Sequence, residues 1–330
     1  MNTIQEHHIA TGLRCILCNS PQLNQIAVNT SFGINIVECH SCHFVQSEYV
    51  SEKALKAYYE NSYLNLNEQQ TNEYKLQQSQ QGESQLNYIN EICGNPQFTN
   101  ALDYGASLGE LARKLKSISE RVYVTENNSK FIDILKQSGM FFVLNESSLF
   151  SAQFEDFFEL VTISHVLEHI PDPLLLLDNF SYILNKRGYL MVDLPNEVQL
   201  LKEYNFQAFG HLHYFTINSF QEMIKKHGKF EIVEIRTCNR TVEEYIASGF
   251  TLPEDYSRTI SENGTVIRAM LRNNCNDGLS ERSTQKYVNE RVLLDDFSQR
   301  IFFLYKNLNL MHQAYLKTQD EIKSLKRLHS

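Results

Sequence analysis

Four cysteines near the start of the chain stand in two tight pairs that could bind a metal ion. They are Cys15, Cys18, Cys39 and Cys42, in "CILC" and "CHSC". Thiolates separated by two residues can occupy adjacent corners of a tetrahedron, so two such pairs close a structural Zn²⁺ site with no open position. The spacing predicts a zinc ribbon, and four reduced, unliganded thiols are the alternative. His40 and His43 are expected on the surface or beside the site, because four thiolates already fill it.

An acidic residue and two glycines form a second pattern, in "ALDYGASLGELARKL". Asp103, Gly105 and Gly109 fall where an expected strand meets a helix, so the backbone can approach a ligand and free N–H groups are at hand. This D-x-G-x-x-x-G pattern differs from the dinucleotide fingerprint G-x-G-x-x-G. The next expected strand, "RVYVTEN", ends in Glu126, whose carboxylate could accept hydrogen bonds from both hydroxyls of a ribose. The turn and Glu126 together predict a nucleotide-like ligand.

Histidines follow two further expected strands. In "SHVLEHIPDP", His165 ends a strand and His169 comes four residues later, with Glu168 between them. This is not the H-E-x-x-H order of zinc proteases, so we exclude a catalytic zinc there. In "FGHLHYFT", His211 and His213 alternate and would share one face of an extended segment. A histidine at either place could be a general base, and the alternative is that these histidines only hydrogen-bond their loops.

The elements that must position these residues alternate between strands and helices from residue 96 to 275. This alternation predicts a doubly wound α/β sheet, which binds ligands at the carboxyl ends of its strands. One expected helix, "PDPLLLLDNFSYILNKRG", ends at Gly188. Residues 239–263 form an insertion between the last two strands, and they are a candidate substrate lid.

Three further segments complete the predicted organisation. Residues 1–50 contain the zinc ribbon, and residues 51–95 form a helical connection. The stretch "NEQQTNEYKLQQSQQGES" within this connection is interpreted as a solvated linker or polar helix without a functional role. Residues 276–330 form a helical extension.

Apolar residues in the C-terminal extension recur in alternating steps of three and four. They are Leu294, Phe297, Ile301, Leu304, Leu308, Met311, Tyr315, Ile322 and Leu325. Such a seam is typical of a coiled coil. Two interpretations stay open, a long helix packed on its own domain and a homodimer formed through this helix.

Composition limits the class of protein. The 330 residues are 42% hydrophobic and 21% charged, as in globular proteins, and the net charge of -9 argues against nucleic acid or an anionic membrane as partner. No apolar segment is long enough to span a bilayer, and "MNTIQEHHIATG" lacks the features of a signal peptide. The odd number of 7 cysteines with tight pairs favours metal over disulfides. We therefore expect a cytoplasmic protein.

These motifs, in their order, resemble those of class I S-adenosylmethionine-dependent methyltransferases. The resemblance rests on the acidic glycine turn, Glu126, "FELVTISHVLEHIPDP" and "LNKRGYLMVDLP", and covers residues 96–275. The segment "ECHSCHFVQSEYVSEKALKAYYENSYL" also resembles the end of a zinc ribbon attached to one bacterial subgroup, which includes sugar C-methyltransferases. The resemblance implies a Rossmann-like fold, S-adenosylmethionine as cofactor, and a small-molecule acceptor such as a sugar nucleotide or another biosynthetic intermediate.

The resemblance also implies roles for individual residues. Gly105 and Gly109 would line the methionine and ribose of the cofactor, Asp103 would orient their loop, and Glu126 would hold the ribose. The segment "NESS" offers Asn145 and Glu146 to the adenine, although Glu146 could equally be a solvated loop residue. The implied cofactor-binding residues are Asp103, Gly105, Ala106, Gly109, Glu126, Asn127, Glu146 and His165. The candidate catalytic residues are His211, His165 and His213.

One departure from the resembling subgroup concerns the acceptor. Sugar C-methyltransferases have a Glu-His pair before an aromatic pair, and here Gly210 replaces that Glu while His211 matches the His. C-methylation is therefore in doubt, and O- or N-methylation stays open. Tyr58, Tyr59 and Tyr63 could cover the site or simply pack.

Three hypotheses about function follow. The leading one is an enzyme that methylates a small molecule, with a histidine as candidate general base. The alternative is a non-catalytic scaffold or binding module that retains the fold and assembles through its ribbon and C-terminal helix. A nicotinamide-dependent oxidoreductase is excluded by the glycine pattern.

Overall fold

The computed structural model describes residues 12–50, 54, 55, 58, 68–207, 210–250 and 253–274, all within the compact unit Met1–Cys275. The predicted seam of residues 276–330 lies outside the described residues, and so do Tyr59 and Tyr63. The coiled coil and the homodimer therefore stay predictions. Within the described part, no helix is both long and apolar enough to cross a membrane.

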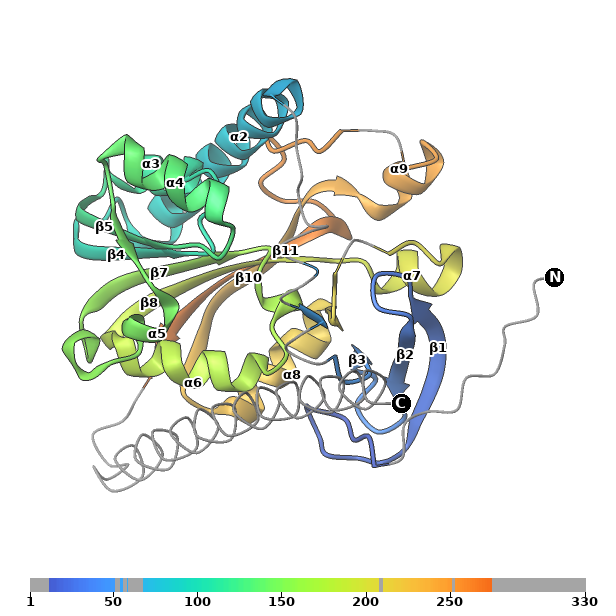
Figure 1. Ribbon diagram of the computed structural model, residues 1–330. Helices are drawn as coiled ribbons and strands as arrows, with labels where there is room; N and C mark the ends of the chain where they lie inside the picture. The colour runs from blue at the N-terminus through green and yellow to red at the C-terminus, as the bar shows by residue number, and fades with distance from the viewer. Residues whose placement is uncertain are drawn as a thin grey trace, which may run out of the picture. The chain divides into compact units, whose positions relative to one another are not determined.

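Seven strands of the described chain form one large sheet, in the order β10-β11-β8-β7-β4-β5-β6 (Figure 1). They are β4 (Phe98–Tyr104), β5 (Ser119–Thr125), β6 (Phe142–Leu144), β7 (Phe158–Ser164), β8 (Leu184–Pro195), β10 (Phe230–Thr241) and β11 (Gly264–Asn273). β4 pairs in parallel with β5 and β7, and the parallel arrangement continues to β6 and β8. β11 lies between β8 and β10 and runs antiparallel to both. This topology confirms the predicted doubly wound, Rossmann-like α/β fold.

Helices cover both faces of the large sheet (Figure 1). The helices of the described chain are α2 (Glu68–Cys93), α3 (Glu110–Leu115), α4 (Ser129–Ser138), α5 (Glu146–Leu149), α6 (Pro173–Ile183), α7 (Val198–Tyr204), α8 (Ile217–His227) and α9 (Val242–Ala247), with short 3₁₀ helices η1 (Ala152–Phe154) and η2 (Leu167–His169). Of these, α7 packs on the N-terminal segment instead of the large sheet. Successive strand residues point to opposite faces. In β4, Ala101 therefore packs with Tyr88 and Leu115 of α2 and α3, whereas Leu102 packs with Phe180 and Phe220 of α6 and α8.

The end of α6 differs from the sequence prediction. Gly188 does not end this helix, because α6 ends at Ile183 and the chain becomes extended at Leu184, the first residue of β8. The side-chain amide of Asn273 donates hydrogen bonds of 2.9 Å to the carbonyls of Ser181 and Leu184. A helix ends where another partner satisfies its last carbonyls, and here that partner is a distant strand.

The N-terminal segment forms a second sheet, with the order β1-β2-β3-β9 in the described chain. Its strands are β1 (Leu23–Asn29), β2 (Ile34–Cys39), β3 (Val45–Ser47) and β9 (His213–Tyr214). β1, β2 and β3 come from the N-terminal segment, whereas β9 comes from the part of the chain that forms the large sheet. β9 pairs antiparallel with β3, so that Val45 lies opposite Tyr214 and Gln46 lies opposite His213. The N–H of Ser47 also donates to the carbonyl of Leu212 at 2.6 Å. The N-terminal sheet is thus completed by the segment that carries His211 and His213, two of the three candidate catalytic histidines.

Candidate active site

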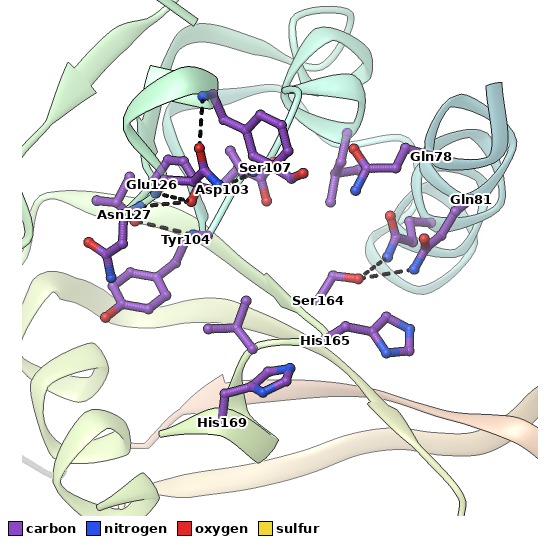
Figure 2. A pocket seen from close by; sticks show the side chains of 18 of the residues that line it. Gln78, Gln81, Asp103, Tyr104, Ser107, Glu126, Asn127, Ser164, His165 and His169 are labelled. Carbon is purple, nitrogen blue, oxygen red and sulfur yellow. Dashed lines mark hydrogen bonds between the residues drawn. The ribbon is translucent and has the colours of Figure 1, made fainter. Parts of the chain in front are cut away.

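A cavity of about 700 Å³ lies at the carboxyl ends of β4, β5 and β7 (Figure 2). Its walls come from the turns after these strands, from one face of α2, and from residues that follow β10. Doubly wound sheets bind their ligands at this edge. The cavity is therefore the place to test each predicted site residue.

The turn after β4 requires glycine at two positions. Gly105 has φ 75° and Gly109 has φ 79°, a left-handed conformation that other residues rarely adopt. A Cβ on Gly105 would lie 2.5 Å from Cγ2 of Val166, and a Cβ on Gly109 would lie 2.6 Å from Cδ2 of Leu135. Val166 belongs to the loop that follows β7 and lines the cavity, so a side chain on Gly105 would clash with the cavity wall.

Glu126 lies at the end of β5, on the wall of the cavity. Its Oε2 accepts the N–H of Ser107 at 2.7 Å, and its Oε1 accepts the N–H groups of Asn127 and Asn128 at 2.8 Å each. Burial raises the pKa of Glu126, and these three hydrogen bonds oppose that rise. The carboxylate is thereby fixed beside the glycine turn. Asn127 lines the same wall.

Asp103 is a buried residue of β4 that lies just before the glycine turn. It is 3% exposed, and the hydroxyl of Thr162 donates to its Oδ1 at 2.8 Å. Burial raises the pKa of Asp103 to about 7, although the Thr162 hydrogen bond lowers it, and the charge of Glu126 raises it further. Ala106 follows in the turn, and its N–H donates to the carbonyl of Thr125 at 2.9 Å. The turn is therefore bonded to the neighbouring strand.

Glu146 lies on the cavity wall, and Asn145 is not among the residues described there. The hydroxyl of Tyr104 donates a short hydrogen bond to the Glu146 carboxylate. Glu146 is thus held at the wall by a buried tyrosine, whereas Asn145 precedes α5 as its N-terminal cap.

His165 lines the cavity. It has φ 52°, and its N–H donates to the carbonyl of Asp193 at 3.0 Å. Its Nδ1 lies 3.6 Å from Oε1 of Glu168. Burial lowers the pKa of His165, but the Glu168 carboxylate more than offsets this, so the net direction is upward. A left-handed backbone at a non-glycine residue is frequent at functional sites.

His211 and His213 lie behind the described cavity wall and are 6% and 4% exposed. Nδ1 of His211 pairs closely with the carboxylate of Glu197. Burial lowers the pKa of His211 and the Glu197 charge raises it, with a net rise. Nε2 of His213 donates to the carbonyl of Ile170 at 2.9 Å, and burial lowers its pKa to about 4. Of the three candidate catalytic histidines, His165 is the one on the described wall.

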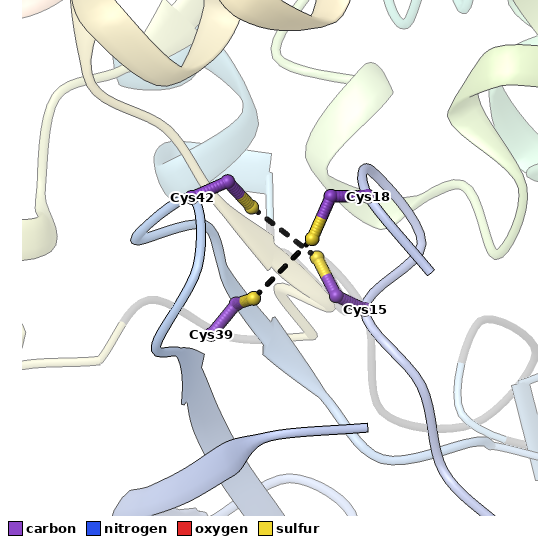
Figure 3. Close-up of side chains that lie close together, drawn as sticks. All are labelled: Cys15, Cys18, Cys39 and Cys42. Atoms are coloured by element: carbon purple, nitrogen blue, oxygen red, sulfur yellow. Dashed lines mark hydrogen bonds between the residues drawn. The ribbon is translucent and has the colours of Figure 1, made fainter. Parts of the chain in front are cut away.

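The four paired cysteines come together as predicted (Figure 3). The Sγ atoms of Cys15 and Cys42 lie 3.5 Å apart, as do those of Cys18 and Cys39, and all four lie within 4.8 Å of one another. Tetrahedral thiolates at about 2.3 Å from Zn²⁺ would lie about 3.8 Å apart. This donor set therefore fits a structural zinc ion.

The two cysteine turns share a backbone conformation. Asn19 and His43, which directly follow the two pairs, have φ 60° and φ 58°. The N–H of Ser41 points to Sγ of Cys39 at 3.4 Å. His40 and His43 are exposed, so neither competes with the thiolates for the metal position.

One family comparison matches this architecture. Residues 76–235 match a family model described as a methyltransferase domain. The match supports a class I methyltransferase. It begins within α2, before the start at residue 96 that the sequence predicted for the methyltransferase domain. A comparison with curated proteins found no match.

Solved structures similar to part of this chain have low sequence identity to it. One is a S-adenosylmethionine-dependent methyltransferase from Thermotoga maritima, with 17% identity, coverage of 62% of this chain and 96% of that chain, and a TM-score of 0.45. Another is the N-methyltransferase NodS from Bradyrhizobium japonicum in complex with S-adenosyl-L-homocysteine, with 14% identity, coverage of 67% and 97%, and a TM-score of 0.41. The YcgJ protein from Bacillus subtilis has 14% identity, coverage of 58% and 98%, and a TM-score of 0.42. These values assign neither a substrate nor a residue role.

Helix α2 contributes cavity residues that the sequence did not single out. Its Gln/Asn-rich stretch is a polar helix, as one interpretation held, but one face of it lines the cavity. Gln81 donates to the hydroxyl of Ser164 at 3.2 Å (Figure 2). Gln85 donates to the same hydroxyl at 2.8 Å and to Asp193 at 2.8 Å. The available signal was the spacing of Gln78, Gln81 and Gln85, which puts all three on one helical face.

The insertion after β10 contributes another part of the cavity wall. Glu254 and Tyr256 line the cavity together with Asn239, which lies near the end of β10. The hydroxyl of Thr265 donates to Oε2 of Glu254 at 3.2 Å. Burial raises the pKa of Glu254. The insertion therefore meets the cavity, as a substrate lid would, and a lid function stays a prediction.

Proposed function

We propose that this chain transfers a methyl group from S-adenosylmethionine to a small-molecule acceptor. The observation that carries the proposal is the glycine turn beside Glu126 on one wall of the cavity, at the carboxyl ends of adjacent parallel strands. The methyltransferase-domain match over residues 76–235 supports the same reaction class.

The residues at this end of the cavity fit the cofactor. Gly105 lines the cavity and has no room for a Cβ, so its backbone can lie against a ligand. The space beside Gly109 is instead filled by Leu135 and Phe141, and Gly109 is not among the described residues that line the cavity. Oε2 of Glu126 accepts only one of the three backbone N–H groups, and a carboxylate oxygen has about two acceptor positions. We propose that the remaining position accepts a ribose hydroxyl, and that Glu146 and Asn127 contact the rest of the nucleoside. The cofactor supplies an electrophilic methyl group on a sulfonium.

The charge of the cavity narrows the acceptor. Among the described residues that line it, none is Lys or Arg, and four are acidic: Asp103, Glu126, Glu146 and Glu254. A diphosphate needs cationic partners to offset its desolvation. We therefore propose a neutral or basic acceptor rather than a sugar nucleotide. Because Gly210 stands where the C-methylating subgroup has its Glu, we also propose N- or O-methylation.

We assign proton removal from the acceptor to His165. Methyl transfer from a sulfonium is an in-line displacement, so the base must reach the acceptor within the cavity. His165 lies on the described wall, whereas His211 and His213 lie behind it. We propose that these two histidines hold the segment that completes the N-terminal sheet. With an acceptor identified by screening, His165→Asn should lower kcat at least about 100-fold while the affinity for S-adenosylhomocysteine stays near that of wild type.

We also propose a structural Zn²⁺ ion at Cys15, Cys18, Cys39 and Cys42. The ion would fix the two cysteine turns, and through them the sheet to which β9 belongs. Short segments with few apolar contacts commonly gain their folding free energy from such a metal.

Calorimetric titration with S-adenosylhomocysteine tests the proposed function. Wild-type protein should bind with a micromolar Kd, about -8 kcal/mol, and Glu126→Ala should bind at least about tenfold more weakly. Glu120→Ala, an exposed carboxylate on the same strand, is the matched control and should bind like wild type. A folded, zinc-loaded wild type that does not bind would favour the non-catalytic scaffold.

A further inference from the structure

A buried carboxylate without a hydrogen-bond partner among the described residues lies behind the cavity wall. Glu168, in the 3₁₀ helix η2, is 0% exposed, and neither of its carboxylate oxygens has a hydrogen-bond partner among the described residues. Burial of an ionised carboxylate carries a large desolvation cost unless a positive charge compensates for it. A buried polar group of this kind therefore needs a physical explanation.

Three imidazole nitrogens surround one oxygen of this carboxylate. Nδ1 of His165, Nε2 of His169 and Nε2 of His211 lie 3.6, 3.9 and 3.8 Å from Oε1 of Glu168. These distances exceed the range of about 2.7–3.2 Å for a hydrogen bond. Ligand atoms that share one ion, at bonds of about 2.1 Å, lie roughly 3.0–3.4 Å apart. The distances between these nitrogens and Oε1 of Glu168 are thus too long for hydrogen bonds and near the spacing of ligand atoms around one metal ion.

Two of these histidines are held by their opposite ring nitrogen. Nδ1 of His169 donates to the carbonyl of Gly210 at 3.1 Å, and Nδ1 of His211 pairs with the buried carboxylate of Glu197. Histidines that bind metals usually donate their second N–H to a carbonyl or carboxylate, which fixes the tautomer and the ring orientation. Both contacts direct Nε2 toward Glu168.

We propose that Glu168, His169 and His211 bind one divalent transition-metal ion. One ligand atom from each of these residues lies within 4.8 Å of the other two. Two imidazoles and a carboxylate suit Zn²⁺ or Fe²⁺ better than Mg²⁺ or Ca²⁺, which prefer oxygen ligands. The sequence order of this segment, which is not H-E-x-x-H, led us to exclude a catalytic zinc there. The proposed site departs from that prediction, since its third ligand, His211, comes from a distant segment.

The proposed ion borders the cavity. His165 and His169 line the cavity wall (Figure 2), and three protein ligands leave a coordination position open. An acceptor oxygen or nitrogen bound there would lose its proton more readily, and His165 lies beside it to take that proton. This role rests on the proposed methyl transfer, whereas the metal binding itself does not.

Cobalt titration of the full-length protein, with the zinc of its cysteine site retained, tests the proposal. Wild type should take up one equivalent of Co²⁺, with visible d–d bands and no thiolate charge-transfer bands, since no cysteine lies in the cluster. Glu168→Gln, which keeps the side-chain shape, should lower the Co²⁺ affinity at least about 100-fold. His227→Gln, at a histidine of α8 whose buried side chain pairs with Asp178 outside the cluster, is the matched control and should bind like wild type.

Two results would overturn the metal site. One is a folded wild type that takes up no Co²⁺ at 100-fold excess, which would mean that a protonated histidine neutralises Glu168. The other is a Glu168→Gln protein that binds Co²⁺ as tightly as wild type. If Glu168→Gln does not fold, Glu197→Gln decides, because loss of the His211 support should weaken binding about 10–100-fold. Calorimetry with S-adenosylhomocysteine on the same samples reports separately on the proposed function.

Discussion

Asn29, the last residue of β1, donates a hydrogen bond from its side-chain amide to the backbone carbonyl of His211 at 2.8 Å. Asn29 is 2% exposed, and its amide also donates to the hydroxyl of Ser47 at 3.1 Å. A residue of the N-terminal sheet thus holds the core histidine that faces Glu168. The N-terminal sheet is therefore part of the structural support of the site, in addition to carrying the cysteines.

Replacement of Asn29 tests this support. Asn29→Ala leaves the buried His211 carbonyl without its main donor, so the free energy of unfolding should fall by about 1–3 kcal/mol. Asn24→Ala, at an exposed position of the same strand, should change it by less than about 0.5 kcal/mol. Urea unfolding of the three proteins measures both values, and equal stability of Asn29→Ala and wild type would contradict the support.

Loss of the cysteine site should loosen the sheet that β9 completes. Cys18→Ser should remove one equivalent of zinc and increase amide hydrogen exchange in β3 and β9, because the metal supplies folding free energy to this segment. Exchange in β7, inside the large sheet, is the internal reference. Cys93→Ser, a cysteine outside the cluster, should retain its zinc. Unchanged exchange in β9 of a zinc-free Cys18→Ser protein would show that the ion does not support this strand.

The carboxyl of Asp103 should make stability depend on pH. Burial raises its pKa from 3.8 to about 7, so between these pH values the folded state keeps a proton that the unfolded state releases. The stability of wild type should therefore fall as pH rises across this window, by up to about 1.4 kcal/mol per pH unit, and level off above it.

Asp103→Asn isolates this contribution. The asparagine Oδ1 can still accept from Thr162, but the side chain does not titrate. Thermal unfolding from pH 4.5 to 8 should show that wild type loses stability relative to the variant as pH rises. Parallel curves for the two proteins would mean that Asp103 is ionised throughout this range.

The glycine turn allows backbone strain and steric clash to be separated. Gly105→Ala should lower stability by about 1–3 kcal/mol and weaken S-adenosylhomocysteine binding, because its Cβ would lie 2.5 Å from Val166. Gly139→Ala has a similar φ of 62° but no atom within 4 Å of the new Cβ, so it measures the backbone cost alone. The double variant Gly105→Ala/Val166→Ala should recover part of the loss, and no recovery would rule out the clash as its cause.

Local spacing predicted the features that depend on neighbouring residues. Each cysteine turn forms within a few residues, and the antiparallel pairing of β1 with β2, which places Leu23 opposite Cys39, brings the two turns together. The glycine turn and Glu126 end adjacent parallel strands, so the strand order alone brings them together. Gly139 ends α4 in a left-handed conformation, as its position after an amphipathic helix predicts.

Tertiary contacts decided the features that the sequence did not predict. The α6 helix ends at Ile183 because Asn273, on β11, satisfies its last carbonyls. The polar residues of α2 looked solvated, yet they face the cavity because Gln85 bonds to Asp193. Asp193 is itself held by a buried, bidentate ion pair with Arg268 at 2.8 and 2.7 Å. In each of these pairs, the two bonded residues lie far apart in the sequence.

A crystal structure of the zinc-loaded protein with S-adenosylhomocysteine tests the central claim most directly. The account predicts the ligand in the cavity, with a ribose hydroxyl about 2.6–3.2 Å from the Glu126 carboxylate, its amino acid portion along the turn of Gly105, and its sulfur toward His165. A ligand bound outside this cavity, or one whose ribose does not contact Glu126, would contradict the assignment of this site to methyl transfer.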